Sequence, residues 1–179
     1  MCIFGYSVRN HLVNPSKMSL SFRAFVMACV FAAAYAKPTT ALAPTPPMGW
    51  MSWEIFRCEI DCEKHNETCI NEYLYKVQTD HLAKDGYVAA GYNGIHIDDC
   101  WMRLNPIRDA SNQLVPDPGR FPSGFKALGD YMHQQNVKFA IYTAESKTTC
   151  AGYPASKGYE TIDANTFASW GVDYLKARP

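Results

Sequence analysis

Four short apolar segments alternate along this chain with three segments whose apolar residues recur at helical spacing. The apolar segments have the length of strands and cover residues 48–54, 94–101, 137–142 and 171–176. Strand and helix in strict alternation predict parallel strands that are joined by right-handed helical crossovers. This order therefore predicts an α/β fold.

The three predicted helices have recognisable ends. The first begins near Thr68 and stops at Asp85–Gly86, the second is capped by Ser123 and ends at Asn136, and Asp163 caps the third. Their expected buried faces consist of Ile70, Tyr73, Leu74 and Val77, of Phe125, Leu128, Tyr131 and Met132, and of Phe167 and Trp170. A proline-containing loop, 104–120, precedes the second helix.

Two adjacent carboxylates, Asp98 and Asp99, end the second apolar segment. An unpaired carboxylate is costly to bury, so we expect the pair to face solvent, a cation or a ligand rich in hydroxyl donors. A sugar would suit them, whereas a solvated strand end or an N-cap pair is the simpler alternative. Tyr142 and Lys176 end two further strands, and ligands bind at the carboxyl ends of parallel strands.

Site residues gathered from several strand ends are typical of a (β/α)8 TIM barrel. A complete barrel needs about 250 residues and eight strands. The chain has 179 residues, so we expect the N-terminal half of a barrel, with four of the eight strands. The inward faces of these strands, carrying Phe139 and Ile141 or their neighbours, would lack the opposite half of the core.

Composition excludes several classes of protein. Hydrophobic residues make up 47% of the chain and charged residues 19%, which is typical of a globular domain, and the net charge is zero. There is no basic patch, so we expect no nucleic-acid partner. We also expect no metal and no cofactor, because no further carboxylate cluster completes an oxygen shell around the aspartate pair.

Residues 1–36 have the pattern of a leader with a signal peptide. Arg23 precedes an apolar run at 24–34, and Ala34-Tyr35-Ala36 is an A-x-A cleavage motif, so residues 37–179 form the expected domain. Translation could begin at Met1 or at Met18. The apolar run is shorter than the ~20 residues of a bilayer span, so no membrane span is expected, although a buried helix is an alternative.

Seven cysteines point to an oxidising compartment. Cys2 and Cys29 lie in the leader, and five remain: Cys58, Cys62, Cys69, Cys100 and Cys150. Four cysteines allow three pairings and the fifth is left over, while their spacing fits a zinc module poorly. Asn66-Glu67-Thr68 is an N-glycosylation sequon, which agrees with passage through the secretory pathway.

Several longer motifs resemble a known family. They are Pro-Pro-Met-Gly-Trp-Met-Ser-Trp-Glu (46–54), Ile-Asp-Asp-Cys-Trp (97–101), Asp-Pro-x-Arg-Phe-Pro-x-Gly (117–124), Thr-Cys-Ala-Gly-Tyr-Pro (149–154) and Trp-Gly-Val-Asp-Tyr-Leu-Lys (170–176). In this order they resemble the animal lysosomal α-galactosidases and α-N-acetylgalactosaminidases of glycoside hydrolase family twenty-seven.

The resemblance implies a retaining exo-glycosidase that removes terminal α-galactose or α-N-acetylgalactosamine from glycolipids and glycoproteins. It implies a lysosomal or extracellular location and a homodimer for full-length members. The expected sugar-binding residues are Trp53, Asp98, Asp99, Tyr142 and Lys176. The expected disulfides are Cys58–Cys100 and Cys62–Cys69, with Cys150 unpaired.

The chain departs from the family pattern after Lys176. Arg178 occupies the position of the family's nucleophilic aspartate, and the acid/base, which comes from a later strand, is absent. Retaining hydrolysis needs two carboxyl groups about 5 Å apart. We therefore expect a truncated form that is inactive alone. The alternative is a secreted, non-catalytic galactose-binding fragment or decoy isoform. The sequence does not distinguish galactose from N-acetylgalactosamine.

Overall fold

The computed structural model describes residues 45–179. The leader expected at 1–36, with its apolar run at 24–34 and both candidate start codons, lies outside the described residues. None of the helices within 45–179 combines the length and the apolar character that crossing a bilayer requires.

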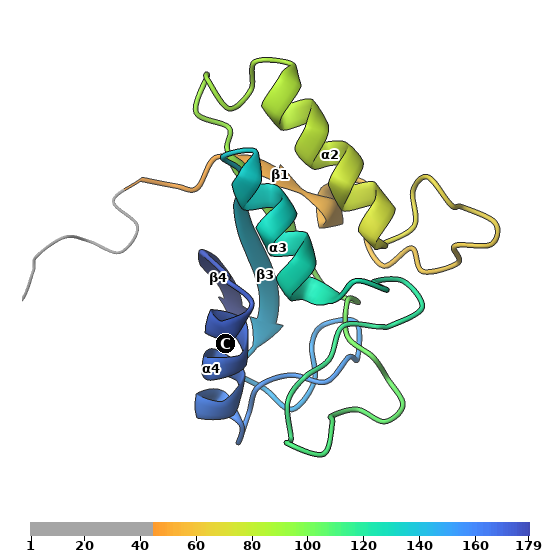
Figure 1. The fold of residues 1–179 in the computed structure, drawn as a ribbon. Coiled ribbons are helices and arrows are strands. Elements are labelled where there is room, and N and C mark those ends of the chain that lie inside the picture. The colour runs from red at the N-terminus through yellow and green to blue at the C-terminus, as the bar shows by residue number, and fades with distance from the viewer. Residues whose placement is uncertain (1–44) are drawn as a thin grey trace, which may run out of the picture. The chain divides into compact units, whose positions relative to one another are not determined.

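The described chain forms a four-stranded parallel sheet whose strand order, β1-β2-β3-β4, follows the order of the sequence (Figure 1). The elements are β1 (Gly49–Met51), the 3-10 helix η2 (Ser52–Glu54), α2 (Glu72–Lys84), β2 (Gly94–Ile97), α3 (Gly124–Gln134), β3 (Lys138–Ala144), α4 (Glu160–Ser169) and β4 (Tyr174–Arg178). A helix follows each of the first three strands, so the predicted α/β alternation is confirmed.

The register of the sheet sorts the strand residues onto two faces. His96 lies opposite Met51 and Ala140, and Ala140 lies opposite Tyr174. Successive side chains of a strand point to opposite faces. Residues two positions further along, Asp98, Tyr142 and Lys176, therefore share a face with this row. We call it the open face.

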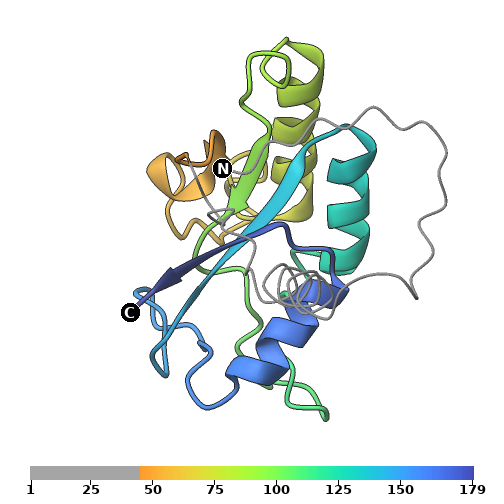
Figure 2. The same ribbon diagram turned by 90° about the vertical axis from the view of Figure 1, so that its left-hand side faces the viewer.

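The opposite face packs against the helices and holds the core. Phe139 meets Phe125 of α3 with ring centroids 5.5 Å apart, and Ile95, Ile97 and Ile141 are buried with it. Figure 2 shows α2 and α3 on the same side of the sheet. Phe139 and Ile141 therefore belong to the helix layer, and it is their neighbours Ala140 and Tyr142 that lie on the open face.

The first helix begins at Glu72, four residues later than the sequence predicts. A disulfide joins Cys62 to Cys69, and the main-chain N–H groups of Thr68 and Cys69 both donate to the His65 carbonyl, which holds this segment as turns. Asn71 is the actual N-cap, since its side chain accepts from the Leu74 N–H at 2.8 Å.

The buried face of α2 also differs from the expected one. Tyr73 is 55% exposed, whereas Tyr75, Thr79 and Leu82 join Leu74 in the interior. Because the helix starts after the disulfide loop, its orientation is set by the N-cap and by stacking of Tyr75 on Phe121, at 6.0 Å between centroids. The Tyr73 prediction was wrong for this reason.

Of the two remaining cap predictions, Ser123 is right in position and Asp163 is wrong. Ser123 occupies the N-cap position of α3, but its side chain makes no capping bond, and its N–H donates to Glu72 Oε2. Asp163 lies inside α4, whose N-cap residue is Tyr159. The Asp163 carboxylate instead accepts two hydrogen bonds from Arg108, at 2.7 and 2.9 Å.

Candidate functional site

The centre of the open face is an ion pair between Lys176 and Asp98. Lys176 Nζ donates to Asp98 Oδ2 at 2.7 Å, and it also lies 5.3 Å from the centroid of the Tyr142 ring. The Lys176 side chain is 42% exposed, while the Asp98 carboxylate is buried. A partly exposed ammonium beside a carboxylate offers donors and acceptors for a hydroxyl-bearing ligand.

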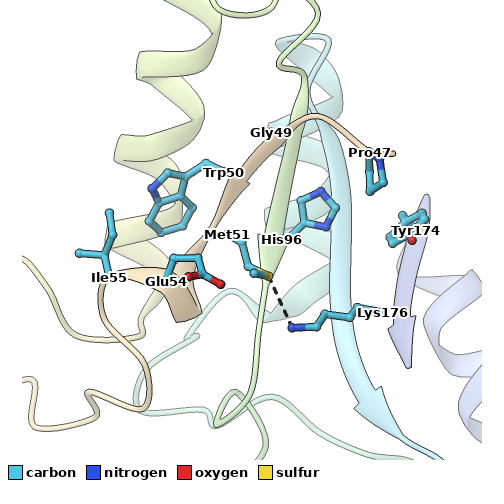
Figure 3. A pocket seen from close by; sticks show the side chains of 9 residues that line it. All are labelled: Pro47, Gly49, Trp50, Met51, Glu54, Ile55, His96, Tyr174 and Lys176. Carbon is cyan, nitrogen blue, oxygen red and sulfur yellow. Dashed lines mark hydrogen bonds between the residues drawn. The ribbon is translucent and has the colours of Figure 1, made fainter. Parts of the chain in front are cut away.

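Lys176 also lines a cavity of about 550 Å³ on the open face (Figure 3). The other lining residues are Pro47, Gly49, Trp50, Met51, Glu54, Ile55, His96 and Tyr174. Figure 3 shows Lys176 reaching toward the Met51 sulfur, with His96 beside them and Trp50, Glu54 and Ile55 on the far side. Apolar walls with a few polar groups are typical of small-molecule sites.

Of the surroundings expected for the two aspartates, which were solvent, a cation or a hydroxyl-rich ligand, solvent is excluded, and Asp98 faces the Lys176 ammonium. Asp98 is 3% exposed and Asp99 1%. Asp98 Oδ1 accepts from the Asp99 N–H, and the Asp99 carboxylate accepts from the N–H groups of Cys100 and Ala151, at 2.8 and 3.0 Å. Lysine and main-chain donors, which the sequence pattern does not display, make this burial tolerable.

Trp53, another of the predicted sugar-binding residues, lies outside the cavity lining. It is half-buried in η2, with the Arg57 guanidinium 5.9 Å from its ring centroid. Its neighbour Ser52 nevertheless connects η2 to the site, because the Asp98 N–H donates to Ser52 Oγ at 3.2 Å.

Two disulfides hold the loops around this end of the sheet. They are Cys58–Cys100 and Cys62–Cys69, the pairs that the resemblance implies, and Cys150 is free and exposed. The Cys58–Cys100 disulfide therefore ties the segment after η2 to the chain just beyond Asp98 and Asp99.

Comparison with known proteins identifies the family. The sequence profile described as "Alpha galactosidase A" matches residues 45–178, which is nearly the whole described chain. This chain belongs to that family, glycoside hydrolase family twenty-seven. It is 49% identical over 136 residues to the alpha-N-acetylgalactosaminidase of Gallus gallus and 47% identical over 135 residues to the alpha-galactosidase A of Homo sapiens. Each alignment covers 75% of this chain and 33% and 31% of the relatives, respectively.

Solved structures of alpha-galactosidases share the fold. The chain superposes on alpha-galactosidase I from Mortierella vinacea with a TM-score of 0.67 and 39% identity, and on the alpha-galactosidase from Saccharomyces cerevisiae with 0.65 and 37%. These matches cover 79% and 74% of this chain but 32% and 26% of the solved chains. The four strands thus form part of a TIM barrel, as predicted. The chain spans about a third of the length of these relatives.

Arg178, at the expected nucleophile position of this alpha-galactosidase-family chain, contacts the free Cys150. Its guanidinium and the Tyr142 hydroxyl, which is 3.3 Å from Cys150 Sγ, both hydrogen bond to the thiol. The Tyr142 hydroxyl and then the Arg178 guanidinium lower the pKa of Cys150, while burial raises the pKa of Tyr142. A cation and a thiol therefore stand beside Tyr142.

His96 is the site residue that sequence reasoning missed. It lines the cavity, and its ring lies 5.6 Å from that of Tyr174 in an edge-on contact. Partial burial, and then the nearby Lys176 ammonium, lower the pKa of His96, although Asp98 acts in the opposite direction. The sequence did contain an indication of both ring residues. His96 lies two residues before Asp98, and Tyr174 lies two residues before Lys176, so each shares a sheet face with a predicted site residue.

Within residues 45–179, no three His, Cys, Asp or Glu side chains lie close enough together to hold a metal ion. The carboxylates of the aspartate pair are bound by Lys176 and by main-chain N–H groups.

Proposed function

We propose that this chain supplies the hydroxyl-binding part of an α-galactoside hydrolase site. The Lys176–Asp98 pair, which lies beside a cavity on the open face of the sheet, carries the proposal. Asp98 has lone pairs left for sugar hydroxyls, and Lys176 has further N–H groups, so together they suit a terminal galactose or N-acetylgalactosamine. Trp53, Asp99 and Tyr142 are proposed to complete this surface.

The same geometry supports a binding role rather than a hydrolytic one for the two aspartates. Retaining hydrolysis needs a carboxylate that attacks the anomeric carbon and a second that shuttles the proton. Asp98 is held by Lys176, and both Asp99 oxygens are occupied by main-chain N–H groups. We infer that the nucleophile and the acid/base are other residues, and that residues 45–179 bind the sugar without cleaving it.

Residence in the secretory pathway fits this function. The described residues form two disulfides, and disulfides form and persist in oxidising compartments. We propose the lysosome or the extracellular space as the final location, because terminal α-galactosides on glycolipids and glycoproteins occur there.

A chimera tests the proposal. Residues 46–176 replace the matching third of the Mortierella vinacea alpha-galactosidase I, and release of aryl from aryl α-galactoside and aryl α-N-acetylgalactosaminide is measured. We expect the chimera to hydrolyse one of them and the chain alone to hydrolyse neither. Asp98→Asn replaces a charged acceptor with a neutral one and should lower kcat/KM by about tenfold, or ~1.4 kcal/mol.

Asp130→Asn is the matched control, because it makes the same chemical change on the exposed surface of α3, where Asp130 pairs with Lys126. It should leave kcat/KM unchanged. A well-folded chimera that is unaffected by Asp98→Asn would contradict the proposed role. Turnover by the chain alone that Asp98→Asn abolishes would show that the catalytic carboxylates are already present.

A further inference from the structure

A sequon lies on the surface, inside a loop that a disulfide closes. Asn66, Glu67 and Thr68 are all exposed, and the Cys62–Cys69 disulfide joins residues on either side of them. The loop precedes α2, so it is separate from the open-face cavity, which none of these residues lines. An exposed sequon in an oxidised protein meets the chemical requirements for an N-linked glycan.

There is also room for a sugar beside Asn66. A hollow of about 380 Å³ lies next to it, and its lining includes Asn66, Tyr73, Lys76 and Arg120. Tyr73, the exposed aromatic of α2, forms part of this wall. An aromatic face covers the apolar face of a pyranose, so the first sugar could pack here without displacing the core.

The closed loop, however, holds the sequon in a turn. The N–H groups of Thr68 and Cys69 donate to the His65 carbonyl at 3.0 and 2.8 Å, and the Thr68 hydroxyl is turned toward the same oxygen at 3.4 Å. The Asn66 carbonyl accepts from the Asn71 side chain, which caps α2. In the closed loop, the Asn66 carbonyl and the Thr68 hydroxyl, which the glycosylating enzyme must engage, are both held by contacts within the protein.

We propose that Asn66 carries an N-linked glycan and that it is attached while the Cys62–Cys69 loop is still open. Asn66 Nδ2 forms a bond to C1 of a polyprenyl diphosphate-linked oligosaccharide, the C1–O bond breaks, the lipid diphosphate leaves with the electron pair, and one amide proton is released. The loop closes when the two thiols transfer two electrons to a disulfide-bearing oxidoreductase and release two protons. Closure before transfer leaves Asn66 unmodified.

Expression of the full chain in a secretory animal cell line tests both parts. The Asn66 peptide is analysed by mass spectrometry after enzymatic deglycosylation in H₂¹⁸O, which marks each formerly glycosylated asparagine. A second arm places residues 37–179 behind an unrelated cleavable signal, so that the result does not depend on the chain's own leader. We expect partial occupancy in the wild type and at least twofold higher occupancy in the Cys62→Ser/Cys69→Ser variant.

Three variants separate the explanations. Thr68→Ala should abolish the mark and Thr68→Ser should retain it, because serine preserves the sequon. Cys58→Ser opens the other disulfide and should leave occupancy at the wild-type level. Unmodified Asn66 in the wild type and in the double-serine variant overturns the site. Equal occupancy in those two proteins, or an equal rise in Cys58→Ser, overturns the order of glycan attachment and loop closure.

Discussion

The Arg108–Asp163 pair offers the sharpest test of what holds the site's loops in place. Arg108 lies in the loop after β2, and Asp163 lies in α4, after the loop that follows β3. Besides the two bonds to Asp163, the guanidinium donates to the carbonyls of Asn112 and Ala155 and lies 3.9 Å from the Tyr159 ring centroid. One side chain thus joins three segments.

The cost of Arg108→Met follows from this burial. The Arg108 side chain is 10% exposed and that of Asp163 1%, so the substitution leaves a buried carboxylate without its partner. Breaking a buried pair from one side costs about 3–5 kcal/mol, and we expect ~4 kcal/mol here because two carbonyls also lose a donor. With a urea slope of roughly 2 kcal/mol per molar, the unfolding midpoint should fall by about 2 M.

Urea unfolding, followed by tryptophan fluorescence, measures the effect, and two further proteins control it. Lys126→Met removes a lysine from an exposed pair and should cost no more than ~0.5 kcal/mol. Arg108→Met combined with Asp163→Leu removes both charges, so it should cost less than the two single changes together. A loss below ~1 kcal/mol for Arg108→Met would refute the argument that this pair fastens the loops.

Three further predictions concern single side chains. Tyr142→Phe removes the largest influence that lowers the pKa of Cys150, so alkylation of this thiol at pH 7 should slow, as measured by iodoacetamide kinetics; an unchanged rate would contradict the contact. The pKa of His96 is lowered in the folded state, so the unfolded chain binds more protons and the free energy of unfolding should fall as the pH drops below about 6.5. His96→Gln should remove this part of the pH dependence, as urea midpoints at several pH values will show. The buried Tyr75 hydroxyl has no hydrogen-bond partner among residues 45–179, so Tyr75→Phe should leave the free energy of unfolding unchanged or raise it by up to ~1 kcal/mol, and a clear loss in the same assay would reveal an unrecognised partner.

The spacing of apolar residues along the sequence was enough to predict the order and type of the strands and helices, because each element carries its own periodicity. It failed where a distant residue decides the outcome. Asp163 looks like a helix cap in sequence, yet Arg108 binds it from 55 residues away. The start of α2 was misplaced because a disulfide, whose pairing spacing alone leaves open, fixes the turns before Asn71.

The site, too, was predictable in part: the sequence indicated some of its residues but not how they are buried. Asp98 and Lys176 were identifiable because strand ends gather in one place, and the structure joins them at 2.7 Å. Their burial was not predictable, since the donors to Asp99 are main-chain N–H groups, which leave no mark in the sequence. His96 lies within β2 and not at its end, so a rule based on strand ends does not select it.

The strands lie in the sheet in the same order in which they are synthesised. β2 pairs with β1, β3 with β2 and β4 with β3, so no strand must wait for a later one to fill a gap beside it. Each newly made strand can dock on an edge that is already in place, and its preceding helix can cover the adjoining face during the same interval. Synthesis from the N-terminus at ~5–20 residues per second leaves seconds for each such addition. Growth of the sheet one crossover at a time adds one new edge at each step, opposite the outer edge of β1, and so limits the pairings that a nascent parallel sheet can sample.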